Sequence, residues 1–192
     1  MSSHLKNFIE VTRLNRPIGF LLLFWPCASG LALANYFKQD FYIFFYYLLL
    51  FFCGSVLMRS AGCIVNDIVD EKIDKKVLRT KKRPIASGVL NKKLAWVYVL
   101  FLCLLAFLIL IQFNKLTIFL GAFSMIFAFS YPFMKRFTYW PQLFLGFTFN
   151  WGIIMAWAAI NNNINYLPVV LYFGAIFWTL GYDTIYGYQD IK

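Results

Sequence analysis

Long apolar runs separated by short polar stretches are the main pattern of this chain. Four runs contain no Asp, Glu, Lys or Arg, at 17–37, 94–114, 116–134 and 137–182, and a shorter one lies at 41–58. A helix needs about 20 apolar residues to cross the hydrocarbon core of a bilayer. The pattern therefore predicts an all-α fold, a polytopic bundle of transmembrane helices.

The run at 137–182 is too long for one helix, and it is interrupted by the polar stretch at 161–165. We therefore expect six spans, at roughly 17–36, 42–65, 94–112, 116–133, 139–160 and 166–186. Residues 1–16 mix basic and apolar side chains, which indicates a short interfacial helix ahead of the first span. The expected organisation is this N-terminal segment followed by one membrane domain over 17–192.

The composition supports a membrane protein and excludes several kinds of site. Hydrophobic residues make up 61% of the chain, against about 45–50% in soluble domains. The single histidine, His4, lies in the N-terminal tail, so a zinc site or a Ser-His-Asp triad is excluded. The four cysteines fall inside predicted spans without a C-x-x-C pair, where small buried side chains are expected.

The formal net charge of +10 reflects membrane orientation rather than nucleic-acid binding. With the N-terminus in the cytoplasm, fifteen basic residues lie on that side, and only Lys38 and Lys115 lie on the other. This asymmetry follows the positive-inside rule. We expect a multi-pass membrane protein with its N-terminus on the cytoplasmic side and with no nucleic-acid partner.

Acidic residues are concentrated at two predicted cytoplasmic helix ends. Carboxylates in such apolar surroundings are costly and usually face a cavity, so both groups indicate a functional site. Six of the eight acids belong to them, Asp67, Asp70, Glu71 and Asp74 in the first group and Asp183 and Asp190 in the second.

The spacing of the first group gives it one helical face. If the second span continues as a helix at about 100° per residue, then Asn66, Asp70, Asp74 and Asp67 fall within about 100°, and Arg59 lies two turns deeper on the same side. Oxygen donors of this kind suit Mg²⁺, and the basic stretch at 79–83 suits phosphate. The alternative is a solvated helix end whose acids pair with nearby lysines.

These motifs resemble the UbiA family of intramembrane prenyltransferases, and within it the branch that acts on hydroxybenzoate. Asn66, Asp67, Asp70 and Asp74 match the first family motif, N-D-x-x-D-x-x-x-D. Asp183, Tyr186 and Asp190 match the second, whose last aspartate would fall two positions beyond Lys192. Flanking likeness covers 16–19, 25–26, 58–63, 79–84, 87–88 and 131–136. Family members typically have nine transmembrane helices, so we expect the chain to lack the last helices.

The resemblance implies that a polyprenyl group passes from a polyprenyl diphosphate to the ring of 4-hydroxybenzoate, ortho to its hydroxyl, as an early membrane step of ubiquinone biosynthesis. It implies Mg²⁺ as cofactor and membrane lipids as the surroundings. By resemblance, Asn66, Asp70 and Asp74 would serve one Mg²⁺, and Asp183 with Asp190 another. The remaining expected site residues are Asp67 and Tyr186 for catalysis, and Arg16, Arg59, Arg79, Arg83, Lys135 and Arg136 for substrate.

Three of these residues have structural alternatives. Arg59 could pair with Asp70, Arg16 could anchor the chain at the membrane surface, and Tyr186 could pack between helices. For the chain as a whole, two other functions stay open. One is an inactive or split-gene fragment of such an enzyme, and the other is a polytopic cation-binding transporter.

Overall fold

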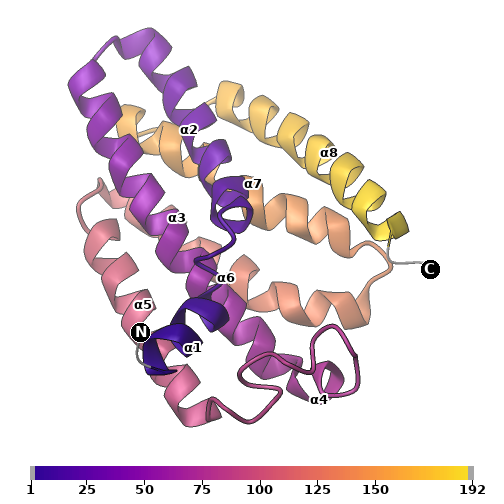
Figure 1. The fold of residues 1–192 in the computed structure, drawn as a ribbon. Coiled ribbons are helices and arrows are strands. Elements are labelled where there is room, and N and C mark those ends of the chain that lie inside the picture. Colours follow the sequence, from indigo (N-terminus) through magenta and orange to yellow (C-terminus); the bar gives the residue numbers. More distant parts are fainter. Residues whose placement is uncertain (1–2, 190–192) are drawn as a thin grey trace. The chain divides into compact units, whose positions relative to one another are not determined.

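The structure, a computed structural model, is all-helical (Figure 1). It describes the backbone of residues 3–189, and the side chains in that range except those at 3–4, 131–133, 135–136 and 189. No strand occurs within 3–189. The helices are α1 (Ser3–Thr12), α2 (Ile18–Lys38), α3 (Phe41–Val69), α4 (Glu71–Asp74), α5 (Lys92–Leu110), α6 (Lys115–Phe137), α7 (Pro141–Asn161) and α8 (Tyr166–Gln189).

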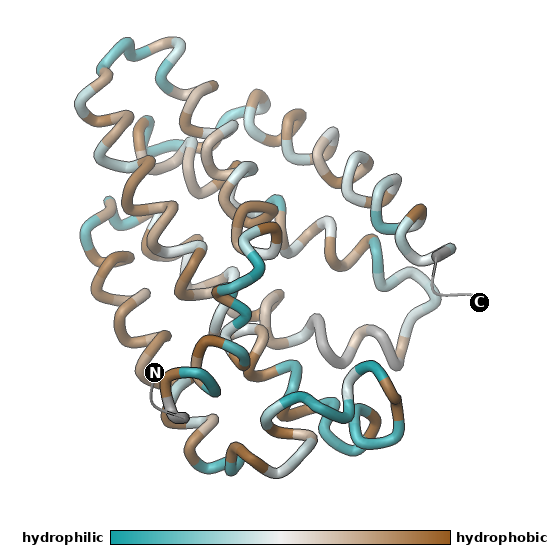
Figure 2. Tube along the Cα trace, viewed as in Figure 1, coloured by the Kyte–Doolittle hydropathy of each residue, from teal (hydrophilic) through white to brown (hydrophobic). Residues whose placement is uncertain are grey.

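Each of the six long helices overlaps one of the six predicted spans, and α1 confirms the short helix expected before them. Five of them, α2, α3, α5, α7 and α8, are long and apolar enough to cross a membrane. In α6 the apolar stretch of the described part is Lys115–Ser130. Figure 2 shows the contrast between these apolar helices and the hydrophilic segment that contains α4.

The chain divides into two compact units, and α2 and α3 contribute to both. The first unit comprises Met1–Leu21 and Cys53–Ile109. Its core joins α1, α3, α5 and the loop before α5, with Val11, Ile64 and Ile85 almost completely buried. The ring of Phe8 in α1 meets that of Tyr98 in α5 edge-to-face at 5.2 Å. The apolar face of α1 is therefore packed inside this unit.

The second unit comprises Leu22–Phe52 and Leu110–Lys192. Its helices α6, α7 and α8 share a core that includes Ile154 and Tyr172. Polar side chains reinforce the packing: the amide of Asn150 in α7 donates to Thr179 Oγ1 in α8 at 2.8 Å, and the indole of Trp151 donates to Leu120 O in α6 at 3.0 Å. Such interhelical bonds are favourable where no water competes for the groups.

Candidate active site

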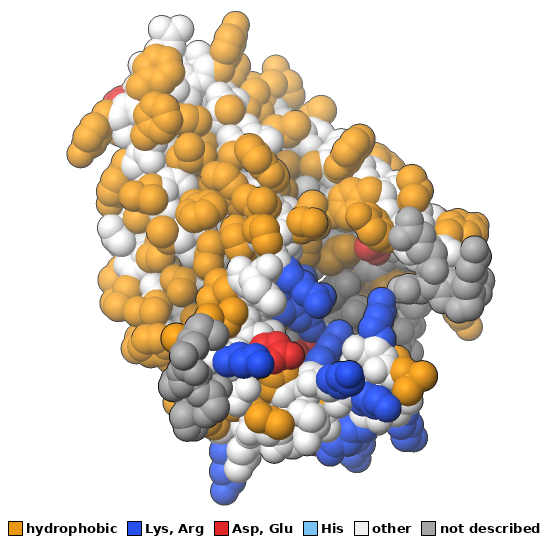
Figure 3. All heavy atoms as spheres, in the orientation of Figure 1, with side chains coloured by type: hydrophobic (Ala, Val, Ile, Leu, Met, Phe, Trp, Pro, Cys, Tyr) orange, Lys and Arg blue, Asp and Glu red, His pale blue; other side chains and the backbone are white. Residues whose placement is uncertain are grey.

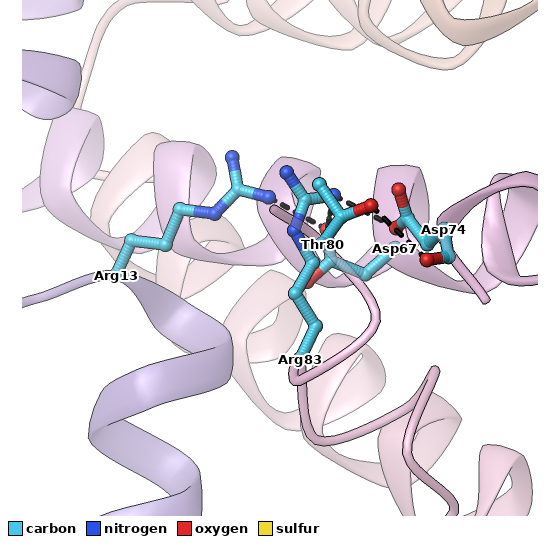
Figure 4. A network of polar contacts seen from close by, with 5 residues as sticks. All are labelled: Arg13, Asp67, Asp74, Thr80 and Arg83. Carbon is cyan, nitrogen blue, oxygen red and sulfur yellow. Dashed lines mark hydrogen bonds and ion pairs between the residues drawn. The ribbon is translucent and has the colours of Figure 1, made fainter. Parts of the chain in front are cut away.

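The candidate site begins at the end of α3, where Asp67 is buried beside two arginines (Figure 4). Only 2% of Asp67 is exposed. Its Oδ1 accepts from Arg13 Nη2 at 2.6 Å and from Arg83 Nη1 at 3.1 Å. Because a buried carboxylate needs charged partners, these two arginines from distant parts of the sequence make the burial possible.

Asp74, at the end of α4, is the second buried carboxylate, and 6% of it is exposed. Arg83 Nη1, which also binds Asp67, donates to Asp74 Oδ2 at 2.8 Å. The backbone carbonyl of Asp74 accepts from the buried hydroxyl of Thr80 at 3.1 Å. Arg83 therefore links the end of α3 to α4. The two aspartates lie close together, as the sequence predicted.

The assumption of one continuous helix through the motif is wrong at Asp70. The helix α3 ends at Val69, Asp70 adopts φ −88° and ψ 3°, and α4 begins at Glu71. The turn is nevertheless tight, since Asp70 N donates to Asn66 O at 2.9 Å and Asp74 N donates to Asp70 O at 2.8 Å. Asn66 and Asp70 are both half-buried. Asp67, in contrast, is buried and binds the arginine pair.

The segment after α4 is strongly basic and exposed. Figure 3 shows the Lys and Arg side chains gathered over α4 and this segment. Arg79, expected to bind substrate, is exposed, whereas Arg83 is half-buried by its aspartate contacts. This end of the first unit carries a concentration of positive charge that would attract an anionic ligand.

Ion pairs of Glu71 connect this segment to the start of α5. Its Oε1 accepts from Lys75 Nζ at 2.8 Å, and its Oε2 pairs with Lys92. Hydrogen bonds from Lys75 and Lys92 lower the pKa of Glu71 from 4.5 to about 2. Glu71 was not among the predicted site residues, and here it stabilises the loop by pairing with nearby lysines.

Two further arginines of the predicted site belong to the same unit. Arg59 is half-buried in α3, and its guanidinium lies so close to Gly19 that a Cβ there would be 2.9 Å from Arg59 Nε. Gly19 thus leaves the space that the Arg59 side chain uses. Arg16 is exposed, in the turn between α1 and α2.

Asp183 of the second acidic group lies in the second unit, near the end of α8. Asp183 is half-buried, and Tyr186 is 66% exposed. The side chains of Asp190, Lys135 and Arg136, which the sequence also assigned to the site, lie outside the described residues. That the two acidic groups form one site therefore stays a prediction.

The family is decided by comparison with known proteins. The sequence model of the UbiA prenyltransferase family matches residues 23–192. The chain belongs to this family. It is 45% identical, over 99% of its length and 46% of the relative's, to the mitochondrial 4-hydroxybenzoate polyprenyltransferase of Arabidopsis thaliana. It is 46% identical, over 99% of its length and 66% of the relative's, to the 4-hydroxybenzoate octaprenyltransferase of Vibrio atlanticus. The chain therefore spans about half to two thirds of the length of these curated relatives.

Solved structures of UbiA proteins share the fold. The apo structure of a UbiA homolog from Aeropyrum pernix K1 is 27% identical and superposes with a TM-score of 0.71, over 89% of this chain and 64% of that one. A UbiA homolog from Archaeoglobus fulgidus, bound to DMAPP and Mg²⁺, is 15% identical, with a TM-score of 0.65 over 92% of this chain and 61% of that one. These likenesses, together with its apolar helices, make this UbiA chain an integral membrane protein.

The first acidic group contains oxygen donors of the kind that Mg²⁺ takes in proteins. Among the described side chains, no three of Asp, Glu, His and Cys form a cluster that could hold a metal alone. Mg²⁺, however, commonly takes only one or two carboxylates and completes its shell with water and substrate phosphate. Asn66, Asp70 and Asp74 supply oxygen donors of this type.

Sequence reasoning missed Arg13 and Thr80 as members of the site. Arg13 lies 54 residues before Asp67, and no local spacing connects the two. The available signal was chemical: a carboxylate near the end of an apolar span needs a cation, and Arg13 is one of three basic residues ahead of the first span. Thr80 carried no comparable signal, because its hydroxyl bonds a backbone carbonyl.

Proposed function

We propose that this chain provides the diphosphate-binding part of a 4-hydroxybenzoate polyprenyltransferase. The observation that carries the proposal is the pair of buried aspartates, Asp67 and Asp74, held by Arg83 at the end of α3. Carboxylates beside exposed cations suit a metal-diphosphate ligand. The names of the curated relatives, at 43–46% identity, support hydroxybenzoate as the acceptor.

In the proposed reaction, the allylic C–O bond to diphosphate breaks. A C–C bond then forms at the ring carbon ortho to the hydroxyl of 4-hydroxybenzoate, and the proton on that carbon leaves. Bound Mg²⁺ would neutralise the negative charge that develops on the leaving diphosphate. Asn66, Asp70 and Asp74 would hold one ion, and Asp183 with Asp190 a second.

The basic residues would hold the anionic ends of the two substrates. Arg79 and Arg83, with Lys135 and Arg136, would bind the diphosphate, because charge-assisted hydrogen bonds strengthen as the leaving group becomes more negative. Arg59 and Arg16 are the candidates for the carboxylate of 4-hydroxybenzoate. The face of the Tyr186 ring would stabilise the allylic cation.

The proposed location is the bacterial inner membrane, with the N-terminus and the site on the cytoplasmic side. It is supported by the basic residues concentrated in the N-terminal tail and around α4, under the positive-inside rule. An inactive or split-gene fragment of the enzyme is the second candidate, and the chain spans about half to two thirds of the length of its curated relatives. A cation transporter is a weaker candidate, since transporter sites usually lie near the bilayer midplane.

The test is product formation in membranes supplied with Mg²⁺, a polyprenyl diphosphate and labelled 4-hydroxybenzoate. Two proteins are compared: the chain itself, and a chimera that continues after Lys192 with the corresponding remainder of the Vibrio atlanticus relative. Label in the lipid phase for the chimera supports the enzyme, and label for the chimera alone shows that these 192 residues need the remainder for activity. If neither yields product while Asp70→Ala alters ion flux, the transporter replaces the enzyme.

A further inference from the structure

The carboxylate of Asp67 is directed at two arginines and is nearly sealed from solvent. Both arginines bind its Oδ1, Arg13 at 2.6 Å and Arg83 at 3.1 Å, and only 3% of the Asp67 side chain is exposed. An ionised carboxylate in this position is neutralised by the arginines that bind it. This is a different environment from that of Asn66 and Asp70, which are half-buried.

Arg13 reaches Asp67 from a fixed position at the end of α1. Thr12, the last residue of α1, is buried, and its hydroxyl donates to Phe8 O at 2.7 Å. Arg13 itself adopts φ 56°, a left-handed conformation that is unfavourable for a residue with a side chain. Such conformations persist where the surroundings enforce them. The buried end of α1 and the bond to Asp67 are the contacts that hold Arg13 in place.

Arg83 extends the chain of contacts to the predicted magnesium ligands. A single nitrogen, Nη1, bonds both Asp67 and Asp74, so the position of one carboxylate fixes the guanidinium that holds the other. The order of contacts is Arg13, Asp67, Arg83 and Asp74 (Figure 4). Because all four belong to the first unit, the network connects α1, α3, α4 and the basic loop within one compact body.

We propose that Asp67 and Arg13 are positioning residues, which hold Arg83 and Asp74 in place for the metal-bound diphosphate without touching it. The inference rests on the proposed function and revises the catalytic role expected for Asp67. It also gives α1 a role in the site: the helix anchors the guanidinium that orients Asp67. Partners one contact removed from a metal site typically change its affinity by about 10–100-fold when they are lost.

The central test is a double-mutant cycle on the purified full chain in detergent, with Mg²⁺ and inorganic diphosphate as the probe. The readout is the diphosphate concentration that gives half of the maximal thermal stabilisation. We expect Arg13→Ala and Asp67→Asn each to raise it about 10-fold. The double variant should bind diphosphate no more weakly than the weaker-binding single variant, because Arg13 acts through Asp67. Effects that multiply would show that Arg13 contacts the ligand independently and would overturn the proposal.

Two control variants test whether loss of folding, rather than loss of the network, causes the weaker diphosphate binding. Arg13→Lys keeps the cation and should recover most of the affinity that Arg13→Ala loses. Glu71→Gln removes an ion-paired carboxylate from the same segment, outside the network, and should bind diphosphate as the wild type does. If Glu71→Gln weakens binding as much as Asp67→Asn, the effect reflects general loosening of the loop, and the positioning role fails.

A proteolysis measurement separates the network from the proposed function. Trypsin cleaves after Arg13, whose side chain is only 27% exposed in its pair with Asp67. Asp67→Asn should speed this cleavage several-fold, and Glu71→Gln should not. If the wild-type chain binds no diphosphate, the proposed function fails. If it binds, but the single variants bind equally well, the positioning role fails alone.

Discussion

At the scale of single residues, Arg83 connects the two buried aspartates of the candidate site. Its Nη1 lies 2.8 Å from Asp74 and 3.1 Å from Asp67, and 30% of the side chain remains exposed. A guanidinium has five donors in a planar fork, so it can bind both carboxylates and still present donors to a ligand. A lysine here would have a single nitrogen for all of these contacts.

Gly19→Ala tests the role of Arg59 without changing a charged group. The new Cβ would lie 2.9 Å from Arg59 Nε, so the guanidinium must move, while the helix backbone need not. We expect the free energy of unfolding to change by less than about 1 kcal/mol, since Ala is the better helix former. If Arg59 binds the carboxylate of 4-hydroxybenzoate, the KM for that substrate should rise in the chimera.

The control for this substitution is Gly62→Ala, in α3, where an added Cβ has no neighbour within 4 Å. It should leave the KM unchanged. An unchanged KM in Gly19→Ala as well would remove Arg59 from the binding site for the aromatic acid.

The ion pairs of Glu71 predict a pH dependence of folding. Its pKa is about 2 in the folded protein against 4.5 ordinarily, because Lys75 and Lys92 bond the ionised form. A lowered pKa contributes stability above pH 4.5, and this contribution is lost as the pH falls from there toward 2. The thermal midpoint of Glu71→Gln should lie below that of the wild type at neutral pH, and the two should converge in acid. A constant difference down to the lowest pH would contradict the assignment.

Among the helices, α2 and α7 approach each other through small residues within the second unit. A Cβ on Gly30 would lie 2.5 Å from Ile153 O, and one on Gly152 would lie 2.3 Å from Cys27 Sγ. Small residues at such contacts let helix backbones come close in membranes. This packing brings the backbones of the two helices close together.

Gly30→Ala should therefore destabilise the protein. Its nearest neighbours are backbone atoms of α7, which cannot rotate away, and overpacking of this kind costs about 1–3 kcal/mol. The matched control is Gly174→Ala in α8, where nothing lies within 4 Å. Unfolding of both variants in mixed micelles measures the difference. Equal stability would show that α2 and α7 are not in close contact at Gly30.

The helices were largely predictable from the sequence, because a span needs a long apolar run and these runs are bounded by charges. The end of α3 was not, since its last turn is polar at Asn66 and Asp67, and the helix continues to Val69. The bend at Asp70 also escaped prediction, as helical spacing assumes a regular backbone. Arg13 was missed because its contact with Asp67 depends on how α1 packs against α3, which no local pattern encodes.

For the whole molecule, the first unit brings one complete motif to the end of a membrane-spanning helix beside a basic loop. The second unit carries Asp183 and Tyr186 near the end of α8. The UbiA family model covers both acidic groups, since it matches residues 23–192. We propose that Asn66, Asp70 and Asp74 bind diphosphate through a metal that Asp70 helps to hold.

The most direct measurement compares Asp70→Asn with Asp40→Asn in the chimera, during a Mg²⁺ titration of prenyl transfer to labelled 4-hydroxybenzoate. Each variant removes one carboxylate, and Asn at 40 can keep the side-chain oxygen that caps α3 by accepting from Ile43 N. We expect Asp40→Asn to follow the wild-type curve, whereas Asp70→Asn should lose about 100-fold in rate or require far more Mg²⁺. Identical Mg²⁺ curves for wild type and Asp70→Asn would contradict this proposal.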